Sequence, residues 1–177
     1  MFELDKLVRD NIKRLTPYSS ARNEFNGDSE VFLDANENPF GKYNRYPDPF
    51  QHELKKALSE IKNVKSENIF LGNGSDEVID LLFRIFCNPG EDKVLTFSPT
   101  YGMYRVSADI NNIELIDVPL NNNFQINLEQ VVPILQDARL KLVFICSPNN
   151  PTGNSINESA IKALLNSFQG IIVIDEA

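Results

Sequence analysis

Apolar and polar residues are arranged along the chain in two recurring patterns. Short apolar runs rich in β-branched residues predict strands over residues 69–71, 94–97, 113–118, 142–146 and 171–174. Apolar residues at helical spacing predict helices over residues 54–61, 75–86 and 157–168, a helix that follows SPTYGMY and lasts until about residue 109, and a helix that begins at about residue 127. Runs that are apolar on both faces are typical of parallel strands covered by helices. The pattern therefore predicts an α/β fold with a mostly parallel sheet flanked by helices.

The amino-terminal part of the chain follows a different pattern. A helical stripe of apolar residues predicts a helix over residues 4–15, and residues 31–34 are interpreted as a short strand. Residues 35–50 are rich in Pro, Gly, Asn and Tyr, which excludes a regular element there and favours a functional loop. We expect an amino-terminal arm over residues 1–30, a small-domain or linker segment over 31–66, and the first part of a large α/β domain over 67–177. The arm has little apolar surface, so it must lie on its own domain or on a partner subunit.

Composition narrows the class of protein. The 177 residues carry a formal net charge of −8, which argues against nonspecific nucleic-acid binding and against docking on anionic membranes. No apolar run approaches membrane-spanning length and no signal peptide is recognisable, so we expect a cytoplasmic protein. Cys87 and Cys146 lie in apolar stretches and are interpreted as core residues of a reducing compartment. The single histidine, His52, cannot form a metal cluster alone, and no metal is expected.

Polar residues follow the last two predicted strands. The sequence SPNNPTG comes after residues 142–146, and Asp175 ends the strand that starts at residue 171. A strand, a helix and a second strand in a short crossover place these polar segments at one edge of the sheet, where α/β proteins bind ligands. A carboxylate at Asp175 suits a cationic ring nitrogen, and the amide of Asn150 suits a ring oxygen; pyridoxal phosphate presents both. Taken alone, NPTG has a tight surface turn as its alternative interpretation, and an aspartate that ends a strand is common.

Two further turns lie at predicted strand ends. Gly72-Asn73-Gly74 precedes a helix that begins at Ser75 or Asp76, an arrangement that exposes backbone amides and can bind a phosphate. A glycine turn with an aspartate capping a helix explains the same residues, and neither a P-loop nor a dinucleotide fingerprint is present. Tyr101 lies in SPTYGMY, where Pro99 and Gly102 restrict the turn; ordinary core packing is its alternative role.

These segments together carry a family resemblance. SPNNPTG with VIDEA resembles the fold-type-I pyridoxal phosphate aminotransferases, and LDANENPFG, NRYPDP and LGNGSDEVI are similar to the histidinol-phosphate aminotransferase branch. The resemblance implies a homodimer that binds pyridoxal 5'-phosphate. It implies that Gly74, Ser75 and Asp76 bind the cofactor phosphate and that Tyr101 stacks on the pyridine ring. It implies that Asn150 lies at the ring oxygen and that Asp175 is the catalytic pyridinium partner. It also implies that Tyr46 reaches the phosphate of the neighbouring subunit's cofactor and that Tyr18, Asn36 and Glu37 lie beside the substrate.

The resemblance also implies a reaction and a longer protein. In that branch histidinol phosphate and 2-oxoglutarate are converted to imidazole acetol phosphate and glutamate, in histidine biosynthesis. The family's Schiff-base lysine lies beyond the DEA segment, and a strand with two apolar faces ends the chain uncovered. We therefore expect a truncated chain that corresponds to an amino-terminal half and is inactive alone. The alternatives are a threonine-phosphate decarboxylase-like enzyme, a nucleotide-binding α/β module and a noncatalytic interaction protein.

Overall fold

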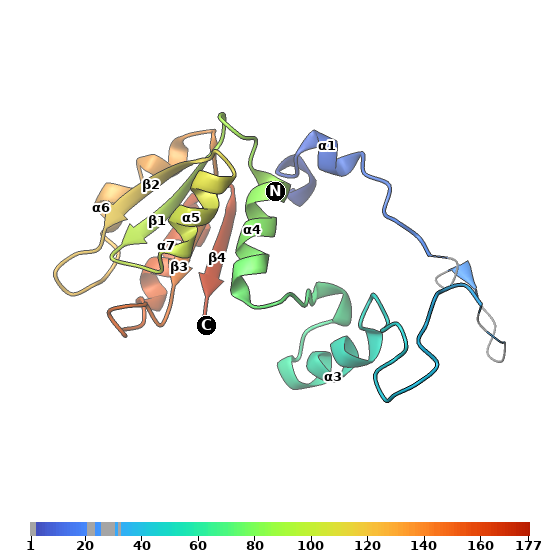
Figure 1. Cartoon of the computed structure of the whole chain (residues 1–177). Helices are drawn as coiled ribbons and strands as arrows, with labels where there is room; N and C mark the ends of the chain where they lie inside the picture. Colours follow the sequence, from blue (N-terminus) through green and yellow to red (C-terminus); the bar gives the residue numbers. More distant parts are fainter. Residues whose placement is uncertain (1–2, 21–23, 26–30, 32) are drawn as a thin grey trace. The chain divides into compact units, whose positions relative to one another are not determined.

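The computed structural model describes residues 3–20, 24–25, 31 and 33–177, and it divides the chain into two compact units (Figure 1). One unit comprises residues 1–15 and 72–177, and the other comprises residues 16–71. The first contains a parallel sheet and is called the sheet unit below. The second is called the loop unit, because most of its described residues lie outside helices and strands.

The sheet has four strands, β1 (Lys93–Ser98), β2 (Glu114–Pro119), β3 (Leu140–Cys146) and β4 (Ile171–Asp175). Their order is β2-β1-β3-β4, and every neighbouring pair is parallel. The prediction of a parallel α/β sheet is confirmed. Only β3 pairs with β4 among the described residues, and the exposed side of β4 borders an apolar pocket of about 650 Å³.

Helices cover both faces of this sheet, as predicted (Figure 1). They are α4 (Ser75–Phe86), α5 (Met103–Ile110), α6 (Leu128–Val131), the 3-10 turn Ile134–Gln136, and α7 (Glu158–Ser167). Side chains of α4 and α5 pack with Phe144 in one core, where Phe83 and Tyr104 are fully buried. Side chains of α6 and α7 pack on the other face around Val143 and Ile145.

The alternation of side chains along the strands determines on which face of the sheet Asp175, the polar residue at the end of β4, lies. Successive side chains of a strand point to opposite faces, so Phe144 and Cys146 lie on the α4/α5 face, opposite Ile145. In the parallel register Cys146 is paired with Asp175. Asp175 therefore shares the α4/α5 face with Tyr104 at the carboxyl edge of the sheet.

The amino-terminal helix predicted over residues 4–15 is wrong. The chain forms a 3-10 turn at Leu4–Lys6 and a short helix α1 at Asp10–Lys13. Between them the backbone N–H of Arg9 donates to the carbonyl of Ile85 at 2.9 Å, and its Nη1 donates to the carbonyl of Arg84 at 2.7 Å. These carbonyls belong to the last turn of α4 and have no partner inside that helix, so Arg9 caps α4. The contact interrupts the helix predicted for the segment that contains Arg9.

Helix α6 is shorter than the predicted helix that begins near residue 127. Asn127 caps α6, since its side chain accepts a hydrogen bond of 3.1 Å from the backbone N–H of Glu129. The helix ends at Val131, two residues before Pro133, which has no N–H to offer and is followed by the 3-10 turn. Asn157 precedes α7 as predicted, but its side chain makes no capping hydrogen bond.

The loop unit contains helix α3 (His52–Lys62) and the 3-10 turn Ser66–Asn68. The predicted helix over residues 54–61 is confirmed. The predicted strands are not: residues 69–71 and the described residues 31, 33 and 34 lie in no strand, because a strand needs a hydrogen-bonded neighbour and the described part of this unit has none. Residue 32 and parts of the predicted arm, residues 1–2, 21–23 and 26–30, lie outside the described residues.

No helix within the described ranges is long and apolar enough to cross a membrane.

Candidate functional site

The loops that follow β1 and β3 meet the end of β4 at the carboxyl edge of the sheet. The backbone N–H of Ser147 donates to the carbonyl of Asp175 at 2.9 Å, which continues the β3–β4 pairing past its last strand pair. Nδ2 of Asn149 donates to the carbonyl of Pro99 at 2.9 Å and so ties the loop after β3 to the loop after β1. The polar segments predicted to share one edge of the sheet therefore do so.

Asn149 organises this edge, although the sequence analysis gave it no role. Its side chain is buried, accepts a hydrogen bond from the Thr100 hydroxyl at 3.0 Å, and donates to Oγ1 of Thr152 at 2.7 Å. Asn150, the residue predicted to contact a ligand, is exposed beside it and is followed by a cis peptide bond to Pro151. One of the two adjacent asparagines thus builds the turn, and the other is available at its surface.

Asp175 is half-buried and both of its carboxylate oxygens accept hydrogen bonds. Oδ2 accepts from the Tyr104 hydroxyl at 2.7 Å, and Oδ1 accepts from the backbone N–H of Ala177 at 3.1 Å. In the described part of the chain no basic side chain lies within ion-pair distance of this carboxylate. Its negative charge is therefore oriented by neutral donors, and no basic side chain among the described residues forms an ion pair with it.

Tyr104 is a second residue that the sequence analysis did not assign to the site. Burial, followed by the hydrogen bond to Asp175, raises the pKa of Tyr104 far above its usual value, so the hydroxyl stays protonated and acts as a donor. Its place beside Tyr101 in the segment SPTYGMY, which follows a strand at the carboxyl edge of the sheet, was the available signal.

Tyr101 connects Tyr104 to the start of α4. Its ring meets the ring of Tyr104 edge-on, with centroids 5.8 Å apart, and its hydroxyl donates to Oδ1 of Asp76 at 3.0 Å. This hydrogen bond is the main cause that raises the pKa of Tyr101. The predicted residues Asp76, Tyr101 and Asp175 are thus joined in one network through Tyr104.

The amino terminus of α4 offers backbone N–H groups to this region. Gly74 precedes the helix at φ +80°, and no heavy atom lies within 4 Å of the position that a Cβ would take. The carboxylate of Glu77 accepts a hydrogen bond from the Asn73 N–H. The amides of Ser75 and Asp76 belong to the first turn, where no intrahelical acceptor exists and the helix dipole favours an anion.

The predicted residues of the loop unit are described within that unit alone. Glu37 accepts hydrogen bonds from Nη1 of Arg45 at 2.7 Å and from the backbone N–H of Tyr46 at 2.9 Å. Its carboxylate therefore holds the segment that presents Tyr46. The side chains of Tyr46, Tyr18 and Asn36 are exposed. The contacts with substrate and with a neighbouring subunit that the sequence analysis assigned to these four residues stay predictions.

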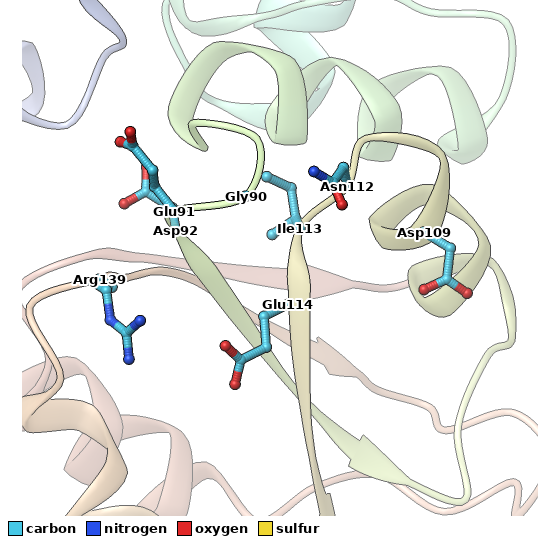
Figure 2. Close-up of a pocket in the computed structure, with 8 residues that line it drawn as sticks. All are labelled: Gly90, Glu91, Asp92, Asp109, Asn112, Ile113, Glu114 and Arg139. Carbon is cyan, nitrogen blue, oxygen red and sulfur yellow. The ribbon is translucent and has the colours of Figure 1, made fainter.

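A polar pocket of about 330 Å³ lies at the opposite, amino-terminal end of β1 and β2 (Figure 2). Its charged side chains spread around the loops and do not converge on one point. Two of its acidic side chains already have a lysine partner: Glu114 lies 3.2 Å from Lys93, and Asp92 lies 3.7 Å from Lys141. The carboxyl edge of the sheet is the stronger candidate site, because it holds the Asp175 carboxylate, which has no ion-pair partner in the described part of the chain, and the first-turn amides of α4.

Comparison with known proteins identifies the class. The family model described as "Aminotransferase class I and II" matches residues 20–177, and the chain belongs to this family. Among curated relatives, histidinol-phosphate aminotransferase of Cytophaga hutchinsonii is 54% identical over 99% of this chain and 52% of its own length. The same enzyme of Parabacteroides distasonis is 54% identical over 100% of this chain and 51% of its own length. The chain spans about half the length of these relatives.

Solved structures share the fold. Histidinol-phosphate aminotransferase of Sinorhizobium meliloti, determined in complex with pyridoxal-5'-phosphate, aligns with a TM-score of 0.67 at 24% identity, over 75% of this chain and 36% of that one. The enzyme of Clostridium acetobutylicum aligns with a TM-score of 0.63 at 29% identity, over 75% and 39%. The expectation of the pyridoxal phosphate-dependent transferase fold is therefore confirmed.

Proposed function

We propose that the protein to which this chain contributes is a pyridoxal phosphate-dependent histidinol-phosphate aminotransferase that uses 2-oxoglutarate as the amino acceptor. The single observation that carries the proposal is the meeting of Asp175, Tyr101 and the start of α4 at one edge of the sheet, in a chain of this family. Identity of about 54% to curated histidinol-phosphate aminotransferases supports the choice of substrate.

The residues present fit the cofactor. Its phosphate carries negative charge and suits the free amides of Ser75 and Asp76 beside the open space at Gly74. Its pyridine nitrogen is a cation when protonated and suits the carboxylate of Asp175, which has no basic partner among the described side chains. The aromatic ring of Tyr101 lies in the network between them and suits the face of a heteroaromatic ring.

Each residue would then have a distinct task in the reaction. When bound, pyridoxal phosphate supplies an electron-accepting ring that stabilises the charge left when the substrate loses its Cα proton. Asp175 holds a proton on the ring nitrogen and thereby keeps the ring electron-poor. Tyr101 fixes the plane of the ring, and the amide of Asn150 donates to its oxygen. We place the lysine that moves the Cα proton, and bonds to the cofactor, outside the 177 residues.

The remaining assignments belong to the same proposal. We infer an arm over residues 1–30, a small-domain segment over 31–66 and a cofactor-binding domain from residue 67 onward. Tyr46 would cross a homodimer interface to the phosphate of the neighbouring cofactor, and Tyr18, Asn36 and Glu37 would border the substrate. The exposure of Tyr46, on a segment fixed by Glu37, supports this arrangement.

The proposal is tested by Asp175→Asn in the full-length protein. The variant replaces the charge that faces the ring nitrogen, and loss of one partner of a buried ion pair costs about 3–5 kcal/mol, so turnover of histidinol phosphate should fall by more than about 100-fold. Glu176→Gln, at the exposed neighbouring position, is the matched control and should keep wild-type turnover. Near wild-type turnover of Asp175→Asn would exclude the assigned role.

Two further measurements separate this function from its alternatives. Sequencing the gene beyond codon 177 should reveal a lysine codon after a Ser-rich segment; an immediate stop codon would favour a noncatalytic protein. The purified full-length enzyme should form glutamate from 2-oxoglutarate with histidinol phosphate as the donor. Release of carbon dioxide from threonine phosphate, without this transfer, would instead identify a decarboxylase.

A further inference from the structure

Tyr104 occupies a central position in the α4/α5 core. Its side chain is fully buried, and its ring stacks on Phe144 with centroids 4.9 Å apart, while Phe144 stacks in turn on Phe83 at 5.4 Å. The other contacts of Tyr104 point to the candidate site: the edge of Tyr101 at 5.8 Å and Oδ2 of Asp175 at 2.7 Å. One side chain therefore links the core to two residues of the site.

The hydroxyl of Tyr104 indicates a role beyond core packing. A phenylalanine would supply the same ring packing, and burying a hydroxyl is unfavourable unless it is hydrogen-bonded. Here the hydroxyl donates to the carboxylate of Asp175 across 71 residues of sequence. The hydrogen bond leaves that oxygen a second lone pair, and the backbone N–H of Ala177 restrains the other oxygen. The plane of the carboxylate is thus fixed before any ligand binds.

We propose that Tyr104 is a positioning residue for the cofactor, which orients the Asp175 carboxylate toward the pyridine nitrogen and supports the Tyr101 ring on the pyridine face. This inference rests on the proposed function and adds a residue to it. Tyr104 contacts no substrate and acts through the two residues that do the binding. Its ring is anchored by Phe144, so the hydroxyl has little freedom to leave the carboxylate. Its raised pKa keeps it a donor throughout the working pH range.

The test is Tyr104→Phe in the full-length protein, with the dissociation constant of pyridoxal phosphate from the cofactor-free enzyme as the primary measurement. Loss of a hydrogen bond to a charged group should weaken binding about 10- to 100-fold. The pH at which the visible absorption band of the bound cofactor changes should also shift, because the charge facing the ring nitrogen is no longer held in place. Phe83→Leu is the packing control: it should lower the melting temperature but leave the dissociation constant within about twofold.

A double-mutant cycle with Asp175→Asn distinguishes positioning from general loosening of the fold. If Tyr104 acts through Asp175, Tyr104→Phe should weaken cofactor binding much less in the Asp175→Asn background than in the wild type. Equal affinities and spectra of Tyr104→Phe and the wild type, or an equal effect in both backgrounds, would overturn this inference and leave the proposed function standing. Failure of the wild-type protein to bind pyridoxal phosphate would overturn both.

Discussion

Thr100 and Asn149 are hydrogen-bonded across 49 residues: the Thr100 hydroxyl donates to Oδ1 of Asn149 at 3.0 Å. The Asn149 side chain also donates to the carbonyl of Pro99 and to Thr152, so one buried amide serves two turns. One turn contains a cis bond before Pro99, and the other contains cis bonds before Pro148 and Pro151. The turn after β1 presents Tyr101, and the turn after β3 presents Asn150. The relative placement of these two proposed cofactor contacts therefore depends on Asn149.

Asn149→Ala should destabilise the protein by about 2–3 kcal/mol, because it leaves the Thr100 hydroxyl and the Pro99 carbonyl without their buried partner. The free energy of unfolding from urea titration is the measurement. Asn150→Ala is the matched control, one residue away and exposed, and should change stability by less than about 0.5 kcal/mol. Similar losses in both variants would contradict a structural role confined to Asn149.

Gly74→Ala and Gly102→Ala form a second matched pair. Both glycines precede a helix, and an added Cβ would meet no heavy atom within 4 Å at either position. Gly74 has a φ of +80° and Gly102 a φ of −67°, so only the first substitution forces an alanine into a left-handed conformation. We expect Gly74→Ala to cost about 1–2 kcal/mol in urea unfolding. Gly102→Ala should be neutral or stabilising by about 0.5 kcal/mol.

Comparing these two variants distinguishes the effect of backbone strain from the effect of steric crowding. Equal stabilities of the two variants would show that the backbone at Gly74 relaxes without cost. In the full-length protein Gly74→Ala should also weaken pyridoxal phosphate binding, since the new Cβ would enter the open space beside the Ser75 amide. Unchanged cofactor affinity would argue against a phosphate at this turn.

The sheet unit was largely predictable from sequence because its two central strands, β1 and β3, are buried on both faces. The runs at residues 94–97 and 142–146 became β1 and β3, each extended by no more than two residues at either end. Such strands appear in the sequence as continuous apolar runs, and the turns between them carry Pro, Gly and Asn. Asn150 lies in the turn after β3, Asp175 ends β4, and the Gly72-Asn73-Gly74 turn precedes α4, each as the sequence predicted.

The sequence predicted less where a residue's partner is distant in the chain. Nothing local to Arg9 reveals that it caps α4, and this contact breaks the helix expected over residues 4–15. Tyr104 looked like one more core aromatic because its partner, Asp175, is 71 residues away. Asn149 and Asn150 are chemically identical neighbours, and only the fold decides which of them is buried.

The hydrogen bonds of Asp48 predict that the loop unit loses stability in acid. Its carboxylate accepts from the backbone N–H groups of His52 and Phe50 at 2.8 Å each and from the His52 ring, and the His52 amide is the largest cause that lowers its pKa to about 2. Because the folded pKa lies below the ordinary aspartate value of 3.8, this contribution to stability is fully present above about pH 4 and is lost as the pH falls toward 2. Carboxyl NMR titration of Asp48 should give the lowered pKa.

The amide donors can be separated from the imidazole by substitution. His52→Ala retains the backbone N–H at the start of α3, so the pKa of Asp48 should stay well below 3.8 in that variant. Asp48→Asn should remove the part of the acid-induced loss that arises from this residue. A pKa of Asp48 that returns to its ordinary value in His52→Ala would show that the ring, and not the backbone, holds the carboxylate.

Gly170→Ala should destabilise the protein for a reason other than backbone conformation. Gly170 follows α7 but does not adopt a left-handed φ; instead its missing Cβ leaves room for the Lys141 carbonyl, which would stand 2.5 Å from an added methyl group, and for the ring of Phe168. The Lys141 carbonyl belongs to β3 and cannot move without disturbing the sheet, so we expect a loss of about 1–3 kcal/mol in urea unfolding. Gln169→Ala, at the exposed adjacent position, should change stability by less than about 0.5 kcal/mol. If Gly170→Ala were equally mild, the end of α7 would have to shift away from β3 at little cost.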